Sequence, residues 1–252
     1  SILIALPTAI ALIAPAATFA QEITSASPTT AIVDSSKCDE RTARFLIEKE
    51  KRNAEREARL SRARADADAK NLKHRSDADA RAASHRARGD AEREAKRAKR
   101  DLKGYKSDAM KAAVQVYQTA VDAATKIWRD SVDAAHTTFH STQDATLKTR
   151  RDAVDAAITA HRTAVDVAFT TWKTRCTGNN ADRRAANQTF RDAVKGASRS
   201  MRDATNKAWH NFRDSMTTAR RTRDDAVRAA QTTFRKAVAD ALQILKTARQ
   251  GA

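Results

Sequence analysis

The sequence predicts an all-α protein, a long antiparallel helical rod in the form of a three-helix bundle or coiled coil built on 11-residue repeats. Three observations predict this fold. The 252-residue chain contains only 5 glycines, and Pro28 is its last proline. Charged residues reach 31% and aromatic residues only 5%, a composition that favours helices with narrow apolar stripes over a thick globular core. An apolar pattern then recurs at every eleventh position from Tyr117 onward.

The N-terminal residues predict export. Residues 1–20 carry no charge and end in Ala17-Thr18-Phe19-Ala20, with small residues at the −3 and −1 positions of a cleavage after Ala20. We interpret them as a signal peptide that is truncated at its N-terminus. The alternative is an uncleaved membrane anchor, and Pro7 and Pro15 favour cleavage. Residues 21–38 are rich in Ser and Thr and predict a flexible leader. The expected destination is the periplasm, the cell envelope or the extracellular space.

Two turns containing glycine divide the rest of the chain. Residues 39–104 predict a charged, Ala-rich helix that ends near Gly104. Residues 105–176 predict a second helix, residues 177–180 a turn, and residues 181–252 a third helix. Within the turn, either Asn179 or Asn180 is expected to cap the helix that follows. Three helices of similar length joined by short connections indicate antiparallel neighbours.

The second and third helices share a repeating unit of aromatic-Arg-Asp-Ala-Val-x-x-Ala-x-x-x. Spacings of 4, 3 and 4 residues place the aromatic, Val and Ala positions on one helical face. An 11-residue period gives about 3.67 residues per turn, which predicts nearly straight helices or a gentle right-handed supercoil. The apolar stripe is expected to comprise Tyr117, Val121, Trp128, Val132, Phe139, Val154, Val165, Trp172, Phe190, Val194, Phe212, Val227, Phe234 and Val238.

Charged residues are expected to pair along each helix. Asp122 precedes Lys126 by four residues and Asp144 precedes Lys148 by four, so each pair predicts an ion pair of roughly 0.2–0.5 kcal/mol. The first helix has mostly Ala in its apolar stripe. It either packs on the other helices through Ala contacts or stands partly detached as a charged helix.

Cys38 and Cys176 are the two cysteines of the chain. In an antiparallel arrangement that turns near Gly104, both thiols reach the same end of the rod. We therefore predict a disulfide between them, which is reasonable in an oxidising compartment. The alternative is two unrelated thiols, one of them filling a Val position of the repeat.

The sequence contains none of the usual catalytic motifs, such as a Gly-rich phosphate loop, Cys-x-x-Cys, His-Glu-x-x-His or Gly-x-Ser-x-Gly. We therefore expect no enzyme activity, no cofactor and no small-molecule substrate. His136 and His140 have the spacing of two metal ligands, but nothing supplies the other ligands, so surface histidines are the interpretation and no metal site is predicted. The aromatic residues could stack on bases, but most fall on the apolar stripe and are expected in the core.

The 11-residue repeats, with Ala, Thr and alternating charge, resemble two broad groups of helical protein. One is the exchangeable apolipoprotein type, and the other is the late-embryogenesis-abundant desiccation proteins. The resemblance covers about residues 106–245 and rests on period and composition. It implies amphipathic helices, and it assigns no functional residue.

The net charge of +17 makes polyanions plausible partners. We expect a non-enzymatic exported structural or adaptor rod of the cell envelope or extracellular space. The alternative is an amphipathic-helix protein that binds an anionic surface, either lipid or acidic polymer. Export argues against nucleic acid as the partner. Two copies of the chain are also expected to be able to pair through their remaining Ala and Thr faces.

Overall fold

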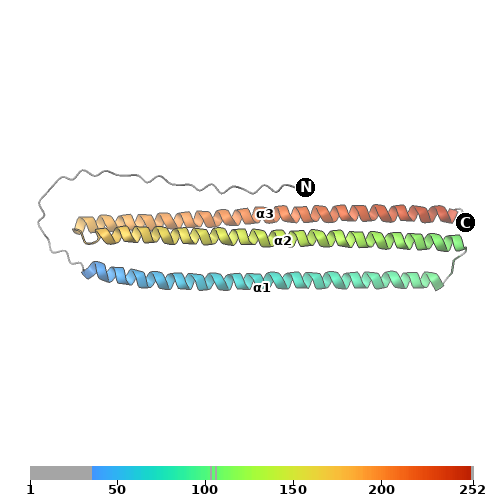
Figure 1. Ribbon diagram of the computed structural model, residues 1–252, viewed down its shortest axis with the longest axis horizontal. Helices are drawn as coiled ribbons and strands as arrows, with labels where there is room; N and C mark the ends of the chain where they lie inside the picture. The colour runs from blue at the N-terminus through green and yellow to red at the C-terminus, as the bar shows by residue number, and fades with distance from the viewer. Residues whose placement is uncertain (1–35, 103, 106, 251–252) are drawn as a thin grey trace, which may run out of the picture. The chain divides into compact units, whose positions relative to one another are not determined.

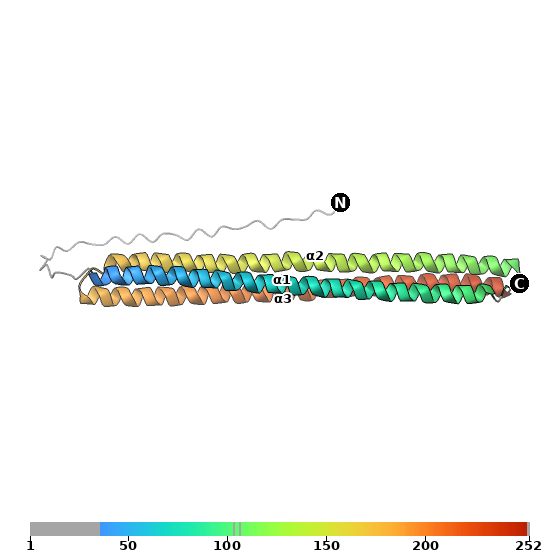
Figure 2. The same cartoon turned by 90° about the horizontal axis from the view of Figure 1, so that it is seen from below.

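The computed structural model describes residues 36–102, 104–105 and 107–250. Three long helices account for nearly all of them: α1 (Ser36–Leu102), α2 (Asp108–Arg175) and α3 (Asn180–Gln250). They run antiparallel, side by side (Figures 1 and 2), and no strand occurs within these ranges. The predicted all-α fold of three antiparallel helices is therefore confirmed. The predicted signal peptide lies outside the described residues, as does most of the predicted leader, whose residues 36–38 open α1.

The connection from α1 to α2 reverses the chain with one glycine and one helix cap. Gly104 has a φ of +69°, in the left-handed region that a residue with a side chain rarely adopts. Its amide donates to the carbonyl oxygen of Asp101 at 3.1 Å. Ser107 then begins the next helix, because its side chain accepts a hydrogen bond from the amide of Met110. The turn predicted at Gly104 therefore coincides with this change of direction.

The connection from α2 to α3 is shorter and uses an asparagine as its cap. The side-chain oxygen of Asn179 accepts hydrogen bonds from the amides of Ala181 at 2.9 Å and Asp182 at 3.0 Å. Asn180, the alternative cap, instead accepts a hydrogen bond from the side chain of Arg183. A Cβ atom added at Gly178 would lie 2.9 Å from the Cβ of Asp182, so a side chain there would force a shift.

Replacing the two neighbouring asparagines separately tests this assignment of the cap. Asn179→Ala should lower the free energy of unfolding by about 1 kcal/mol, because two amides of the first turn lose their acceptor. Asn180→Ala is the matched control and should cost less than half as much. Urea unfolding followed by circular dichroism measures both. Equal losses for the two variants would contradict the assignment.

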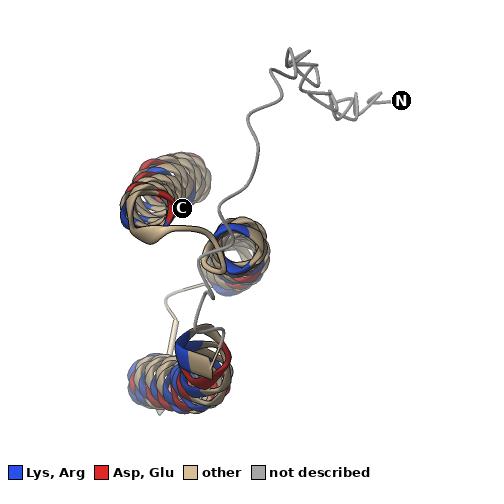
Figure 3. Ribbon diagram, turned by 90° about the vertical axis from the view of Figure 1, so that its left-hand side faces the viewer, with Lys and Arg blue, Asp and Glu red and all other residues tan. Residues whose placement is uncertain are grey.

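The three helices do not share one central core. Figure 3 looks along the helices and shows α2 lying between α1 and α3. The backbones of α2 and α3 approach closely over their length, whereas α1 makes few such close approaches to either of them. Helices of 67 to 71 residues are roughly 100 Å long at 1.5 Å per residue. The molecule therefore has two long helix–helix contacts of different chemistry, one on each side of α2.

Candidate functional site

The contact between α2 and α3 buries the predicted apolar stripe. Trp172 is buried and the other predicted stripe residues are half-buried. Between them lie buried alanines, among them Ala124 and Ala135 on α2 and Ala219 and Ala230 on α3. Because alanine has only a methyl group, the two backbones can come close at these positions, and the aromatic and Val side chains fill the space beside them. The stripe thus forms an interface between two helices.

The aromatic positions of α2 and α3 meet in a constant register. Trp128 contacts Phe234, with ring centroids 5.9 Å apart. Eleven residues further along α2 and eleven back along α3, the guanidinium of Arg223 lies 4.8 Å from the ring centroid of Phe139. One further step brings Arg150 to within 5.4 Å of the ring centroid of Phe212. Each arginine that occupies an aromatic position therefore faces an aromatic ring, in a cation–π contact worth about 0.5–1 kcal/mol.

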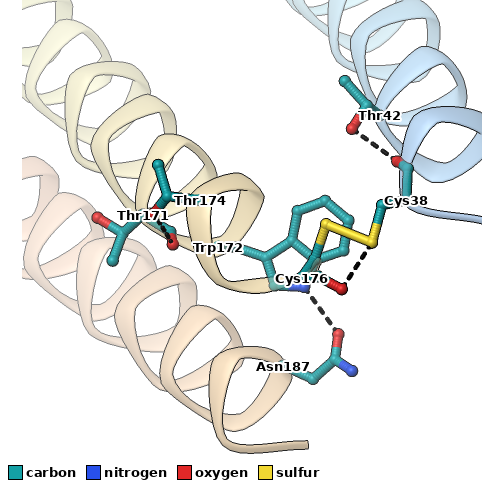
Figure 4. Close-up of a disulfide and its surroundings, with 7 residues drawn as sticks. All are labelled: Cys38, Thr42, Thr171, Trp172, Thr174, Cys176 and Asn187. Atoms are coloured by element: carbon teal, nitrogen blue, oxygen red, sulfur yellow. Dashed lines mark hydrogen bonds between the residues drawn. A yellow bond between two sulfur atoms is a disulfide. The ribbon is translucent and has the colours of Figure 1, made fainter. Parts of the chain in front are cut away.

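A cluster of apolar side chains closes one end of the molecule around a disulfide. Cys38 of α1 is joined to Cys176, which follows the end of α2, with their Cα atoms 6.1 Å apart. This separation is ordinary for a disulfide. Phe169 and Trp172 of α2 lie beside the bridge, and Figure 4 shows the indole next to Cys176. The indole nitrogen of Trp172 donates to the side-chain oxygen of Asn187 at 2.9 Å.

Aromatic stacking extends this cluster to all three helices. The ring of Phe45 on α1 stacks on Phe169 with centroids 4.0 Å apart and an interplanar angle of 16°. Phe45 also meets Phe190 of α3 edge-on at 5.7 Å. Sequence reasoning missed Phe45 and Phe169, because neither falls on the 11-residue series of aromatic positions. A Phe seven residues after Cys38, at the same end of the molecule, was the available signal.

Ion pairs hold α1 along the side of α2. Four arginines of α1 pair with four aspartates of α2, and successive pairs lie eleven residues apart on both helices. The pairs are Arg64 with Asp155, Arg75 with Asp144, Arg86 with Asp133 and Arg97 with Asp122. The first, second and fourth pairs have N–O distances of 2.6 Å. Arg64, Arg75 and Arg86 each use both terminal nitrogens on both carboxylate oxygens.

In three further ion pairs between the same two helices, the arginine belongs to α2 and the carboxylate to α1. Arg129, Arg151 and Arg162 of α2 pair with Asp90, Asp68 and Glu57 of α1. Lys49 of α1 adds a pair with Asp166. An exposed ion pair is typically worth only about 0.2–1 kcal/mol, but two-pronged Arg–carboxylate geometry repeated along a network is the arrangement in which such pairs matter. Beyond the cluster around the disulfide, charged side chains therefore hold α1 against α2, and the predicted Ala contacts do not.

This docking overturns the intrahelical ion pairs predicted for α2. Asp122 and Asp144 bind arginines of α1, as described above. Lys126 and Lys148 instead pair with Asp130 and Asp152, one turn further on. The prediction was wrong because arginines of a neighbouring helix reach these carboxylates, with two parallel hydrogen bonds from Arg75 to Asp144 and one from Arg97 to Asp122. The arginines at 64, 75, 86 and 97 were the signal that could have revealed the docking face.

The ion pairs make the docking of α1 sensitive to acid. Hydrogen bonds from Arg86 and Arg75 lower the pKa values of Asp133 and Asp144 below the ordinary value of about 3.9. A carboxylate with a lowered pKa stabilises the fold above its unfolded-state pKa, and this contribution is lost as the pH falls through the folded-state pKa. We therefore expect thermal stability to fall steeply below about pH 3.9.

The double variant Asp133→Asn/Asp144→Asn provides the control for the acid effect. It lacks two of the titrating carboxylates, so it should be less stable than the parent at pH 7 and should lose less stability between pH 5 and pH 2. Melting curves by circular dichroism at several pH values measure both effects. Equal losses in parent and variant would show that other groups cause the acid sensitivity.

Two histidines of α2 lie one turn apart, at the spacing of two metal ligands. His136 and His140 have ring centroids 6.4 Å apart. Within the described ranges, no three His, Cys, Asp or Glu side chains come together as metal ligands would. His161 is half-buried with its Nε2 3.2 Å from the hydroxyl of Ser198. Burial, helped by the positive charges of Arg56 and Arg162, lowers the pKa of His161.

An open trough runs along the contact between α2 and α3. One section of it has a volume of about 850 Å³ and is lined by Phe139, by Ala, Ser and Thr side chains, and by Asp214 and Arg223. The adjoining section, of about 360 Å³, is lined by Trp128 and Phe234. None of the described helices contains an apolar stretch that is long enough to cross a membrane. Within the described residues, the trough is an extended hollow that the chain leaves open.

No protein-family model matches this chain, and comparisons with curated proteins and with solved structures each found no similar protein.

Proposed function

We propose that the chain is a non-enzymatic structural or adaptor rod that acts outside the cytoplasm, in the cell envelope or the extracellular space. Its role would be to hold a fixed separation of roughly 100 Å between the groups attached at its two ends, which is the length of one of its helices. Enzymatic activity is not part of this proposal, and neither is a cofactor.

The observation that carries the proposal is that the chain uses its apolar stripe on itself. Trp172 is only 7% exposed, and Trp128 packs against Phe234 across the contact between α2 and α3. A protein that spreads amphipathic helices on a lipid surface would keep such a stripe available for that surface. Ion pairs and a disulfide fix α1 in addition, so the assembly has the connections expected of a stiff element.

Two features support an extracytoplasmic location. Residues 1–20 have the composition of a signal peptide. Cys38 and Cys176 are the two cysteines of the chain and they are joined to each other, which is the usual state of cysteines in an oxidising compartment. The disulfide therefore supports both the proposed compartment and the proposed stiffness.

Circular dichroism of the purified chain tests the proposal. We expect high helicity and one cooperative melting transition in plain buffer, both unchanged by vesicles of anionic phospholipid. Low helicity that rises sharply when vesicles are added would refute the rod. That result would favour the alternative, an amphipathic protein that opens on an anionic surface.

Processing of the N-terminus tests the location. Residues 1–30 should direct a fused reporter across the membrane of an expressing bacterium, and cleavage should leave Gln21 as the first residue. Mass spectrometry of the exported product measures the cleavage position. A reporter that stays inside the cell would refute the proposed export, and an exported but uncleaved reporter would favour the membrane anchor.

A further inference from the structure

The side of the α2–α3 pair that bears the trough carries a band of uncharged positions along most of its length, although Asp214 and Arg223 also line the trough. On α2, within residues 116–171, three series of positions begin at Val116, Ala120 and Ala123 and recur at every eleventh residue. On α3, two series begin at Thr189 and Ala193 and recur at the same interval. Together these series comprise 16 positions on α2 and 12 on α3, and none of the 28 is charged. In a chain with 31% charged residues, an uncharged face of this length calls for an explanation.

This uncharged face is accessible in the single chain. Its positions are exposed except Ala120, Ala237 and Ala248, which are half-buried. Thr138, in the middle of the face, lies five residues beyond Asp133, which binds α1. Five residues correspond to roughly 140° around a helix, so α1 does not cover the face. Large aliphatic side chains project from it as well, including Ile127 at 59% exposure and Val167 at 62%.

The threonine hydroxyls of the uncharged face already have partners. The threonines of the face each donate their hydroxyl to the carbonyl oxygen four residues earlier, with distances between 2.9 and 3.1 Å for Thr138, Thr142, Thr149, Thr171, Thr189, Thr222 and Thr233. A hydroxyl that keeps its hydrogen bond can be buried at little cost. The face is therefore suited to contact with another protein surface.

We propose that the uncharged face is the contact surface between two copies of this chain. Each chain has a net charge of +17, so two copies repel each other wherever their charged faces meet. The uncharged face is the extended surface among the described residues on which they can approach without opposing like charges. The 28 residues match the roughly 20–30 residues that each partner contributes to an interface of standard size.

The chemistry of the face favours a second copy over a lipid surface. Small side chains let helices approach closely and allow matched alanines and threonines to interlock across a twofold axis. A lipid-binding face would present large apolar side chains at most of its positions, whereas only Val116, Ile127, Val167 and Ile244 are large and apolar among these 28. In the resulting dimer, the α2–α3 pairs of the two chains form the inner layers, and each α1 remains on the outside. The proposal builds on the proposed rod, because it requires the α2–α3 pair to be folded without a partner.

Neighbouring threonines on α3 provide a matched test. Thr233 belongs to the uncharged face, and Thr218 lines the trough one turn before Thr222 of that face. Thr217 and Thr232 lie beside the trough on the helix, and Thr217, Thr218, Thr232 and Thr233 all donate to the carbonyl four residues earlier. The variant Thr218→Arg/Thr233→Arg places four cations in the proposed interface of a dimer. The variant Thr217→Arg/Thr232→Arg adds the same charge outside it.

Sedimentation equilibrium of the purified chain decides between the outcomes. We expect the parent and the Thr217→Arg/Thr232→Arg variant to have twice the mass of the 27.7 kDa chain. Thr218→Arg/Thr233→Arg should raise the dissociation constant at least about 100-fold, because like charges meet across the interface. Circular dichroism should give all three proteins the same helicity.

Other results would overturn the proposal in distinguishable ways. A fully helical parent that remains monomeric at 100 µM would refute the dimer and leave the rod standing. Equal dissociation of both variants would place the contact elsewhere. A monomer that binds anionic vesicles, and loses this binding in Thr218→Arg/Thr233→Arg alone, would assign the face to lipid. A parent with low helicity would refute the rod and the dimer together.

Discussion

Removing the disulfide between Cys38 and Cys176 is expected to lower the free energy of unfolding by about 4–5 kcal/mol. The bond closes a loop with a sequence separation of 138 residues, and the stabilisation by a disulfide grows with the logarithm of loop length. Loss of the disulfide should destabilise mainly the docking of α1. That helix buries few side chains, and among its residues the burial is concentrated at Cys38 and, in part, at Phe45.

Urea unfolding in the presence and absence of a thiol reductant measures this effect. The double variant Cys38→Ala/Cys176→Ala should resemble the reduced protein, and the reductant should not change it further. Because the α2–α3 contact does not involve the bond, we expect a partly unfolded state in which α1 is released and the other two helices remain paired. A loss below about 1 kcal/mol would show that the ion pairs alone hold α1.

Trp172→Ala is expected to lower the free energy of unfolding by about 3–5 kcal/mol. The indole is 7% exposed, stacks against Phe169 at 5.5 Å and donates a hydrogen bond to Asn187. Truncation leaves a cavity at the point where all three helices meet, and it leaves the amide of Asn187 without its donor. The substitution therefore removes a packing contact and a part-buried hydrogen bond together.

Trp209→Ala is the matched control for Trp172→Ala. Trp209 is 44% exposed, and its ring makes a cation–π contact with Arg213 at 5.7 Å. Its loss should cost no more than about 1 kcal/mol. Trp172→Phe separates the two roles of Trp172, because it retains most of the packing and removes the hydrogen bond. Similar losses for Trp172→Ala and Trp209→Ala would show that the cluster around the disulfide contributes no more to the free energy of unfolding than an exposed tryptophan does.

Local chemistry made much of the fold predictable. The turns follow from Gly104 and from the run 177–180, because glycine allows a positive φ and asparagine can cap a helix. The residues that form the contact between α2 and α3 could also be predicted, since alanines and aromatic residues alternate on one face of each helix. Equal helix lengths then bring both cysteines to the same end. Each of these features depends on residues that are close in the sequence or on simple geometry.

The helices, their antiparallel order and the apolar stripe could be predicted from the sequence, because they depend on the period of the apolar pattern and on breaks in the chain. The way in which α1 is held became clear only from the packing of the folded chain. Asp122 has a suitable cation four residues away and another on α1, and the spacing of charges within α2 cannot distinguish them. The choice of Arg97 rests on the position of the neighbouring helix, and the stacking of Phe45 on Phe169 has the same origin. Both contacts depend on the packing of segments that are distant in the sequence, which local periodicity does not encode.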